Sequence, residues 1–587
     1  MTALWIGTAA LPLLVALGLA MAGLLPDHLA ERSRLLLTSL APVTVLPAAW
    51  LGSAAPDGVE VAMDWLLLGT TFRIDDVGRP LLVLAAVLYG LALVMVARSD
   101  LPRPSALSGL LLLCFVANAG VFVAADVVTL YLCFTVMSLV GYALVIHDRT
   151  ADARRSGRIY LFLAVLGEAA VLVAAMLVVR AGGLELAVTA ERVAASGHTG
   201  LIVALLWLGF GIKVGVVPLH VWLPLAHPAA PTPASAVLSG AMITGGLAGW
   251  LRMLPLGEAA MPTWGLVFVV GGLAGAYLAV LLGVMQAKTK AVLAYSSISQ
   301  MGMLSALVGA ALIDPDGAPV LVAAAVLYAL HHGIIKAALF FGVGLWGAHG
   351  AGSGRVVVIA GFAVAGLSLA GLPWTSGYLA KYSAKEAADG VLVAGLDVAS
   401  ALVLVGMGST VLLARAVWLL GHSRAGSRGV DIMLLGWVGL IGASIPLVLW
   451  TAAGGAEVSV PGWWDLGTWW AQGWPVLAGV GAAALALRLS GTRALPDWLA
   501  HPDGRAVPPG DLVVAEEWLA SMIRQGVQAL SRSIARGRDV IAVGIRRVPA
   551  PARWFNLGEQ RLATWRASGL TFLGMAGVFV ILAWWGA

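Results

Sequence analysis

Long apolar segments separated by short polar ones run through the chain from end to end. Each is long enough to cross a bilayer as a helix and too long for a strand of a membrane barrel. They lie near residues 3–25, 33–52, 78–98, 106–124, 126–147, 157–181, 200–223, 234–254, 263–284, 290–313, 318–348, 356–380, 391–420, 431–452, 472–489 and 568–586. The pattern predicts an all-α polytopic membrane protein with about 14–16 transmembrane helices.

Composition supports this class. Hydrophobic residues make up 60% of the 587 positions and charged residues 11%, and the mean hydropathy is +0.93. A soluble domain of this length does not have such values. The first segment, residues 3–25, is long and lacks a basic leader, so we interpret it as a membrane span and not as a cleaved signal.

Motifs for covalent or redox chemistry are missing from the sequence. The two cysteines, Cys114 and Cys133, lie in apolar segments and form no disulfide framework or metal-binding spacing. We find no phosphate loop, iron–sulfur cysteine set or dinucleotide fingerprint. We therefore expect no cofactor and no catalytic chemistry in this chain. Any redox cofactors would belong to other chains, and membership of an oxidoreductase complex stays open.

Basic residues gather in every second loop, beginning with the loop that carries Arg149, Arg154, Arg155 and Arg158. Loops rich in lysine and arginine face the cytoplasm. The alternation predicts a multi-pass protein of the cell's inner (cytoplasmic) membrane, with both termini outside and residues 490–567 in the cytoplasm.

The most informative stretch runs from Trp207 to Arg252. Its apolar helix contains one charge, Lys213, and is interrupted by Pro218 and His220. A lysine in an apolar span is costly unless it faces a polar cavity or a partner. Transporters build ion sites where a charge lies beside a helix break. The alternative is a kinked structural helix whose lysine reaches the surface, but Lys213 lies about a dozen residues into the span, at ~1.5 Å per residue.

The block HVWLPLAHPAAPTPASAVLSG resembles the proton-translocating membrane subunits shared by complex I (subunits L, M and N), Mrp antiporters (subunits A and D) and energy-converting hydrogenases. Its amino-acid sequence is most similar to hydrogenase-4 component B and the Mrp D-type proteins. The resemblance covers roughly residues 60–460 and implies two inverted five-helix repeats. The expected organisation is 1–105 for N-terminal helices, 106–254 and 263–420 for the two repeats, 431–489 for further helices, 490–567 for a cytoplasmic amphipathic segment and 568–586 for a terminal helix.

The first repeat departs from the family pattern at two positions. In DVVTLYLCFTVMSLVGYALV, Thr135 stands where the resemblance implies the main proton-carrying glutamate. Thr244 stands where hydrogenase-type and Mrp D-type relatives have a lysine. The next span contains Glu168, about ten residues into an apolar helix, and a buried carboxylate can exchange protons near neutral pH. We hypothesise that Glu168 substitutes for the missing glutamate; the alternative is a structural glutamate paired with a lysine or hydroxyl.

The second repeat keeps more of the pattern. MQAKTKAVLAYSSISQMG places Lys290 near the cytoplasmic end, where proton uptake and simple anchoring are both open. In LYALHHGIIKAALFFG, His332 and Lys336 are four residues apart on one helical face and match the family's paired positions. Histidine titrates near neutral pH, so the two form a sensible proton relay. His331 points elsewhere and could serve packing only.

A second broken helix is expected in LSLAGLPWTSGYLAKYSAKEAA. Gly371 and Pro373 break it, and Lys381 follows. The Pro218 and Pro373 breaks lie five spans apart, an odd number, so the two halves have opposite orientation, as inverted repeats do.

Residues 508–548 show apolar positions at close to helical period, with arginines on much of the opposite face. This predicts an amphipathic lateral helix, followed by a terminal anchor helix at 568–586. Such a helix implies contact with neighbouring membrane subunits and the lipid bilayer; the alternative is an interfacial helix that covers the protein's own base. Nothing indicates nucleic-acid binding.

The leading hypothesis is a proton-translocating membrane subunit of a redox-driven complex of the hydrogenase-4 or NADH–quinone oxidoreductase type, with peripheral redox subunits as partners. The candidate proton path comprises Glu168, Lys213, His220, Lys290, His332, Lys336 and Lys381. Two alternatives remain: an Mrp-type cation/proton antiporter subunit, and a structural subunit that has lost pumping.

Overall fold

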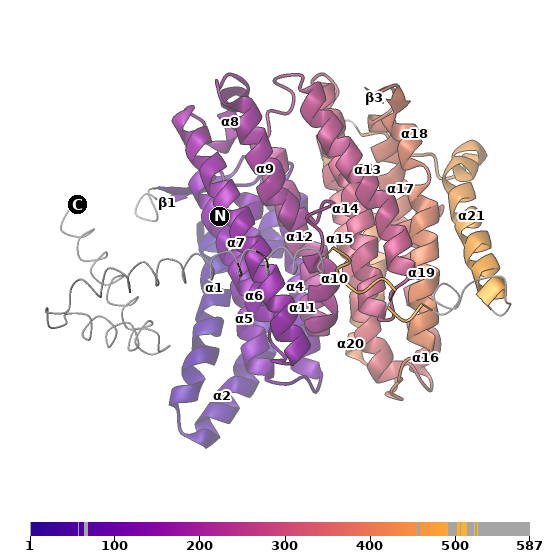
Figure 1. Cartoon of the computed structure of the whole chain (residues 1–587). Helices are drawn as coiled ribbons and strands as arrows, with labels where there is room; N and C mark the ends of the chain where they lie inside the picture. The colour runs from indigo at the N-terminus through magenta and orange to yellow at the C-terminus, as the bar shows by residue number, and fades with distance from the viewer. Residues whose placement is uncertain are drawn as a thin grey trace, which may run out of the picture. The chain divides into compact units, whose positions relative to one another are not determined.

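The computed structural model describes residues 2–56, 58–63, 69–454, 458–490, 502–504 and 506–512, together with residues 522 and 525. Residues up to Leu512 form one compact unit, a bundle of long helices (Figure 1). In the described part, strands occur only as two short antiparallel hairpins, β1–β2 and β3–β4. The all-α polytopic fold is confirmed.

The elements in chain order are α1 (Thr2–Met21), η1 (Ala22–Leu24), α2 (Asp27–Leu40), η2 (Ala41–Val45), α3 (Leu46–Ala54), β1 (Glu60–Met63), β2 (Thr70–Arg73), α4 (Gly78–Arg98), α5 (Pro104–Val123), α6 (Val127–Val145), α7 (Ala151–Arg180), α8 (Leu186–Ala194), α9 (Thr199–Val214), α10 (Trp222–Ala229), α11 (Thr232–Val237), η3 (Leu238–Met242), α12 (Ile243–Met253), α13 (Pro262–Val284), α14 (Thr289–Ile313), α15 (Ala318–His349), α16 (Gly354–Ala370), α17 (Ser376–Ala387), β3 (Leu392–Val393), β4 (Leu396–Asp397), α18 (Val398–Leu402), α19 (Val405–Gly421), α20 (Ile432–Gly454) and α21 (Leu466–Ser490).

Among the described residues, 13 helices are long and apolar enough to cross a membrane. Two shorter apolar helices, α9 and α16, are the first parts of the predicted broken helices. Together they account for the first fifteen predicted segments, whose positions are therefore confirmed. The sixteenth, at 568–586, lies outside the described residues.

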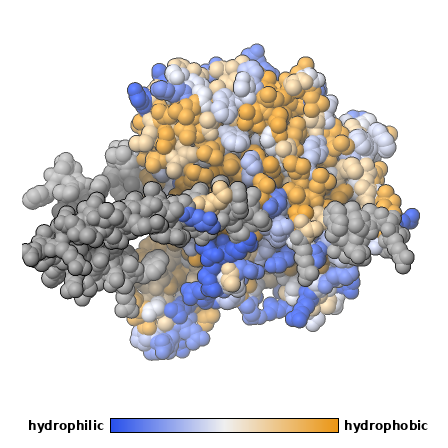
Figure 2. Space-filling view, in the orientation of Figure 1, coloured by the Kyte–Doolittle hydropathy of each residue, from blue (hydrophilic) through white to orange (hydrophobic). Residues whose placement is uncertain are grey.

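The most deeply buried spans are α14 and the segment Thr232–Met253, each 94% buried along its most apolar part, compared with 22% for α21. Helices at the periphery expose large apolar side chains such as Leu14, Met176 and Leu477. On the face shown in Figure 2, apolar residues cover much of the surface and hydrophilic residues gather mainly toward its lower edge. Lipid tails favour such a surface, because they form no hydrogen bonds with side chains.

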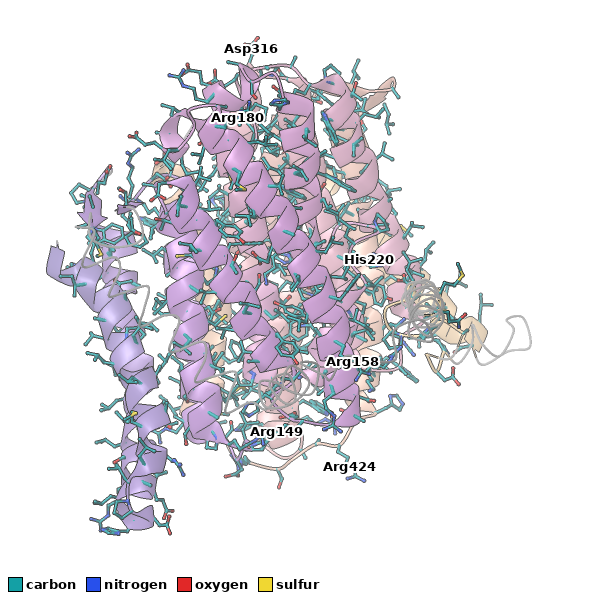
Figure 3. All side chains as sticks on the ribbon, turned by 60° about the vertical axis from the view of Figure 1, so that its left-hand side comes forward. Arg149, Arg158, Arg180, His220, Asp316 and Arg424 are labelled. Carbon is teal, nitrogen blue, oxygen red and sulfur yellow. The ribbon has the colours of Figure 1, made fainter. Side chains whose placement is uncertain are left out.

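Charged residues mark the two ends of the bundle. Arg149, Arg158 and Arg424 lie at one end, which we call the basic end, and Asp316 and Arg180 lie at the opposite end (Figure 3). Residues from the loops predicted to be cytoplasmic thus share one end, as the alternation of loop charges requires.

The first broken helix is present, but a glycine ends its first part. The helix α9 stops at Val214, and Gly215 takes a left-handed conformation with φ 82°. A helix end leaves its last carbonyls without backbone donors. The indole Nε1 of Trp222, the first residue of α10, donates a hydrogen bond to the Ile212 carbonyl at 2.7 Å. Pro218 lies in the loop between the two parts.

The second broken helix follows the same design. The helix α16 ends at Ala370, Gly371 adopts φ 96°, and α17 begins at Ser376 beyond Pro373. One more glycine is required here: a Cβ on Gly377 would overlap the carbonyl oxygen of Ser368. The break predicted at Gly371 and Pro373 is confirmed.

The tail departs from the prediction at its start. Residues 508–512, assigned by sequence to the beginning of the amphipathic helix, form turns that pack against the bundle. Pro508 and Pro509 have no backbone N–H group, and Gly510 adopts a left-handed φ of 73°, so this run does not favour a helix. Apart from residues 522 and 525, the remainder of the predicted helix lies outside the described residues.

Substituting Gly377 by alanine tests the second break. We expect Gly377→Ala to lower the free energy of unfolding by roughly 3 kcal/mol or more, because the new methyl group overlaps backbone. A matched control is Gly439→Ala in α20, where a Cβ has open space. The melting temperature and yield of the purified chain measure both. Equal stability of the two variants would contradict this packing.

Candidate functional site

Lys213 lies in the last turn of α9 and is 4% exposed. Its Nζ donates a hydrogen bond to the hydroxyl of Tyr160 in α7 at 2.9 Å. That hydroxyl donates in turn to the Ser138 carbonyl of α6 at 3.0 Å. Three spans of the first repeat therefore meet at this lysine.

Glu168 of α7 is 7% exposed and faces the neighbouring helix α6. The hydroxyl of Thr135 donates a hydrogen bond to its Oε2 at 2.5 Å. The structure thus places a carboxylate directly beside the position where the family pattern expects one. The two positions lie on adjacent helices, so a carboxylate reaches the same place from either.

Glu168 and Lys213 line one small cavity together with Ser138 and Tyr160. Its volume is ≈ 10 Å³, roughly the space that one water molecule requires. The remaining walls are apolar and include Phe134, Gly209, Ile212 and Trp222. The first repeat therefore holds a lysine, a carboxylate and two hydroxyl-bearing neighbours in an otherwise apolar interior.

Thr244 contributes no charge to this group. Its hydroxyl donates to the Ala241 carbonyl of its own helical segment at 2.7 Å, and its side chain is fully buried. That bond links Thr244 to neither Lys213 nor Glu168.

The second repeat holds Lys336 of α15 at the centre of the bundle, with no exposed surface. Its Nζ donates to the hydroxyl of Ser296 in α14 at 2.6 Å and also to the Leu293 carbonyl. The ammonium lies 5.3 Å from the centre of the Phe340 ring. His332, also fully buried, lies one helical turn before it.

His331 makes the connection that the sequence analysis missed. Its Nδ1 is 2.9 Å from the hydroxyl of Ser376, the first residue of α17. That hydroxyl is 3.1 Å from the hydroxyl of Ser368 in α16. His331 therefore links α15 to both parts of the second broken helix and does more than fill space. The only signal in the sequence was two polar residues in apolar surroundings, Ser368 and Ser376, on either side of the break.

Lys381 of α17 is 5% exposed, and its Nζ donates to the carbonyl of Ala370 at 3.3 Å. Ala370 is the last residue of α16. Lys213 likewise occupies the last turn of α9. Each lysine therefore lies at the carbonyl end of the first part of a broken helix, where the helix dipole favours a cation.

The two remaining candidates, Lys290 and His220, lie in α14 and in the first helix break. Lys290 of α14 is half-buried and donates to the Ala230 carbonyl at 2.8 Å and to the Ser235 hydroxyl at 3.3 Å. It thereby holds the proline-rich bend between α10 and α11. His220 lies in the first helix break and contacts the carboxylate of Asp511 at 3.2 Å.

A further buried histidine was not singled out from the sequence. His227 of α10 stacks on Phe340 at 4.5 Å between ring centres. Within the described residues, neither of its ring nitrogens has a hydrogen-bond partner. His227 therefore brings the first repeat against the ring that lies under Lys336 in the second.

Across the residues that the structure describes, no three histidine, cysteine, aspartate or glutamate side chains gather as a metal site would require.

Comparison with known proteins agrees with this geometry. Residues 124–412 match the family model described as "NADH:quinone oxidoreductase/Mrp antiporter, TM". These residues make up just under half of the 587-residue chain. We call them the antiporter domain; it contains both broken helices and every candidate residue except those of the C-terminal segment.

Among curated relatives, hydrogenase-4 component B of Escherichia coli is 31% identical to this chain. The alignment covers 47% of this chain and 43% of that protein, so the chain spans less than half of the relative's length.

Two solved structures share the fold. One is from the Mrp complex of a Dietzia species, with a TM-score of 0.70, 21% identity, and coverage of 95% of this chain and 66% of that one. The other is from the archaeal membrane-bound sulfane sulfur reductase, with a TM-score of 0.62, 19% identity, and coverage of 82% and 99%. The fold therefore extends beyond the antiporter domain to most of the chain.

Removing the Tyr160 hydroxyl tests how Lys213 is held. We expect Tyr160→Phe to lower the free energy of unfolding by about 1–3 kcal/mol, because a buried ammonium loses its hydrogen-bond acceptor. Tyr131→Phe, at a half-buried tyrosine of the neighbouring helix α6, is the matched control. Thermal unfolding of the purified chain measures the difference. The same melting temperature for both variants would show that Lys213 does not depend on this bond.

Proposed function

We propose that this chain is a proton-translocating membrane subunit of a multi-subunit, redox-driven complex of the hydrogenase-4 or NADH–quinone oxidoreductase type. The observation that carries the proposal is the first cluster: Glu168 held by Thr135, and Lys213 held by Tyr160, around one small cavity. Burying a lysine and a carboxylate within the membrane near a helix break costs free energy, and such residues usually belong to proton or ion paths.

The chain's own groups supply a simple cycle. In an apolar interior, separating a lysine from a carboxylate favours loss of the lysine's proton, and bringing them together favours the charged pair. Lys213 has a neutral alternative partner in the Tyr160 hydroxyl. Lys336 and Lys381 are held by hydroxyl and carbonyl oxygens. In the second repeat, protons would pass from Lys336 through His332 and His331 toward Lys381, since imidazole exchanges protons near neutral pH.

The same proposal includes orientation and location. We place the chain in the cytoplasmic membrane with the basic end facing the cytoplasm and both termini outside. The shared location of Arg149, Arg158 and Arg424 supports this assignment. Protons would enter from the basic end, near Lys290.

Other membrane subunits and peripheral redox subunits are the proposed partners, and the cofactors would reside in those partners. The matched relatives carry names of such assemblies: a hydrogenase component and an archaeal respiratory membrane complex. Purifying the tagged chain in mild detergent, followed by mass spectrometry of the bound proteins, tests this part. Nickel–iron, flavin or iron–sulfur subunits support it.

A cation/proton antiporter subunit is the second candidate. The likeness to a chain of an Mrp complex, over 95% of this chain, favours it. If the purified chain brings down only small hydrophobic antiporter chains and no redox subunits, this second function would be favoured. A purely structural role is disfavoured by three buried lysines, each held by a specific acceptor.

Moving the carboxylate back to its neighbouring helix tests the proposal directly. The purified complex is reconstituted in liposomes, a potassium diffusion potential is imposed, and a trapped pH dye reports proton flux. We expect Glu168→Gln to reduce flux at least about tenfold, since a proton carrier is lost. The double variant Thr135→Glu, Glu168→Gln should recover much of it, because the two side chains already touch.

The exposed Glu191 of α8 provides the control, and Glu191→Gln should leave the flux unchanged. Absence of flux in the wild-type complex would count against the proposed function. Full proton flux in the Glu168→Gln variant would show that Glu168 is not part of a proton path.

A further inference from the structure

The C-terminal segment after α21 returns to the antiporter domain. Its described residues, 502–504 and 506–512, run from α19 to α10 (Figure 1). Arg415 of α19 donates to the Pro502 carbonyl at 2.8 Å, and Gln286 donates to the Val507 carbonyl at 3.1 Å. Gln286 belongs to the α13–α14 loop that also carries Lys288, two residues before Lys290 of α14. Two side chains of the bundle therefore fix the course of the segment.

The segment then makes a close approach to the first broken helix. Gly510 adopts φ 73°, and a Cβ at this position would lie 2.9 Å from the Val221 carbonyl oxygen and from Leu225. Only glycine allows the backbone to lie this near. The close approach delivers the next residue, Asp511, to the helix break.

Asp511 contacts His220 inside the break. Its two carboxylate oxygens lie 3.2 and 3.3 Å from the Nε2 of His220. The His220 side chain is 2% exposed and the Asp511 side chain 11%. The ring of Tyr295, in α14, lies 6.5 Å from that of His220. The Nδ1 of His220 is buried and has no hydrogen-bond partner within the described ranges.

Stability alone does not explain why the Asp511 carboxylate is largely buried. Burial of a charged pair contributes little stability by itself, because both groups lose their water, and apolar residues usually serve equally well. The break is also where the chain already places Lys213, five residues before Pro218. His220 lies at mid-height between the two ends of the bundle in Figure 3.

We propose that Asp511 is a proton-exchanging residue of the first half of the path, supplied by the C-terminal segment and paired with His220. The first half would then use two carboxylates that lie outside the family's expected position, Glu168 and Asp511. The proton would pass between the imidazole and the carboxylate as the pair forms and separates. This inference rests on the proposed function, because it assigns a further residue to the same path.

The test uses the flux assay on the reconstituted complex. We expect Asp511→Asn to reduce proton flux at least about threefold, since the amide cannot carry the proton, and Asp511→Glu to restore more than about half of it. Asp152→Asn is the matched control. Asp152 is an exposed carboxylate in the first turn of α7, 3.9 Å from Lys288, and its loss should leave flux unchanged.

A second control separates proton exchange from simple docking. Gln286→Leu removes the hydrogen bond to the Val507 carbonyl and loosens the segment without touching the pair. Full flux in this variant, with reduced flux in Asp511→Asn, supports the proposal. Equal loss in Gln286→Leu, failure of Asp511→Glu, or full flux in Asp511→Asn would each overturn it.

Should Asp511→Asn lower the yield of folded complex, His220→Asn serves as the second variant and must show the same loss of flux per folded complex. Failure of both to fold would make the pair a structural anchor and overturn the proposal. Absence of proton flux in the wild-type complex would instead contradict the proposed function itself.

Discussion

The buried ammonium groups are the constraint on which the rest of the structure depends. Lys213, Lys336 and Lys381 are each at most 5% exposed in a bundle whose outer surface is apolar. An unpaired charge in such an interior is costly, so each lysine needs oxygen acceptors within reach. The fold supplies a tyrosine hydroxyl, a serine hydroxyl and the carbonyl end of a half-helix. Two helix breaks exist at the cost of backbone hydrogen bonds, and they create much of this environment.

The two repeats meet the constraint differently. In the first, Lys213 shares a small cavity with a carboxylate that comes from α7 instead of α6. In the second, Lys336 and Lys381 rest on neutral oxygens, and His331 connects α15 to both sides of the break. The first repeat is also the one that receives Asp511 from outside the family-matched region. Glu168 and Asp511 thus both lie near the first helix break, beside Thr135 and His220 respectively.

Much of this architecture follows from the sequence. Apolar length alone locates fifteen spans, because a helix must cover the bilayer, and Pro218 and Pro373 mark both breaks. Periodicity could not show that Gly215 ends the first half-helix before the proline is reached. It also assigned Pro508 to Leu512 to a helix, although the proline pair and Gly510 disfavour one.

The contacts of the site were less accessible to sequence reasoning. The adjacency of Thr135 and Glu168 could be suspected from neighbouring spans, but their contact depends on how α6 and α7 are rotated against each other. Tyr160 and Ser376 carry no sequence signal beyond being polar residues in apolar surroundings. Asp511 is 291 positions from His220, so their contact exists only in the folded chain.

The most direct test of the central claim is to observe Glu168 changing its protonation state. Infrared difference spectroscopy of the reconstituted complex, with and without an imposed proton gradient, detects the carbonyl band of a protonated carboxyl group in an apolar site. We predict a band that changes with the gradient, is absent in Glu168→Gln and shifts when Thr135→Val removes its hydrogen bond. A wild-type spectrum that does not change with the gradient, or the same band in Glu168→Gln, would contradict a proton-carrying role for Glu168.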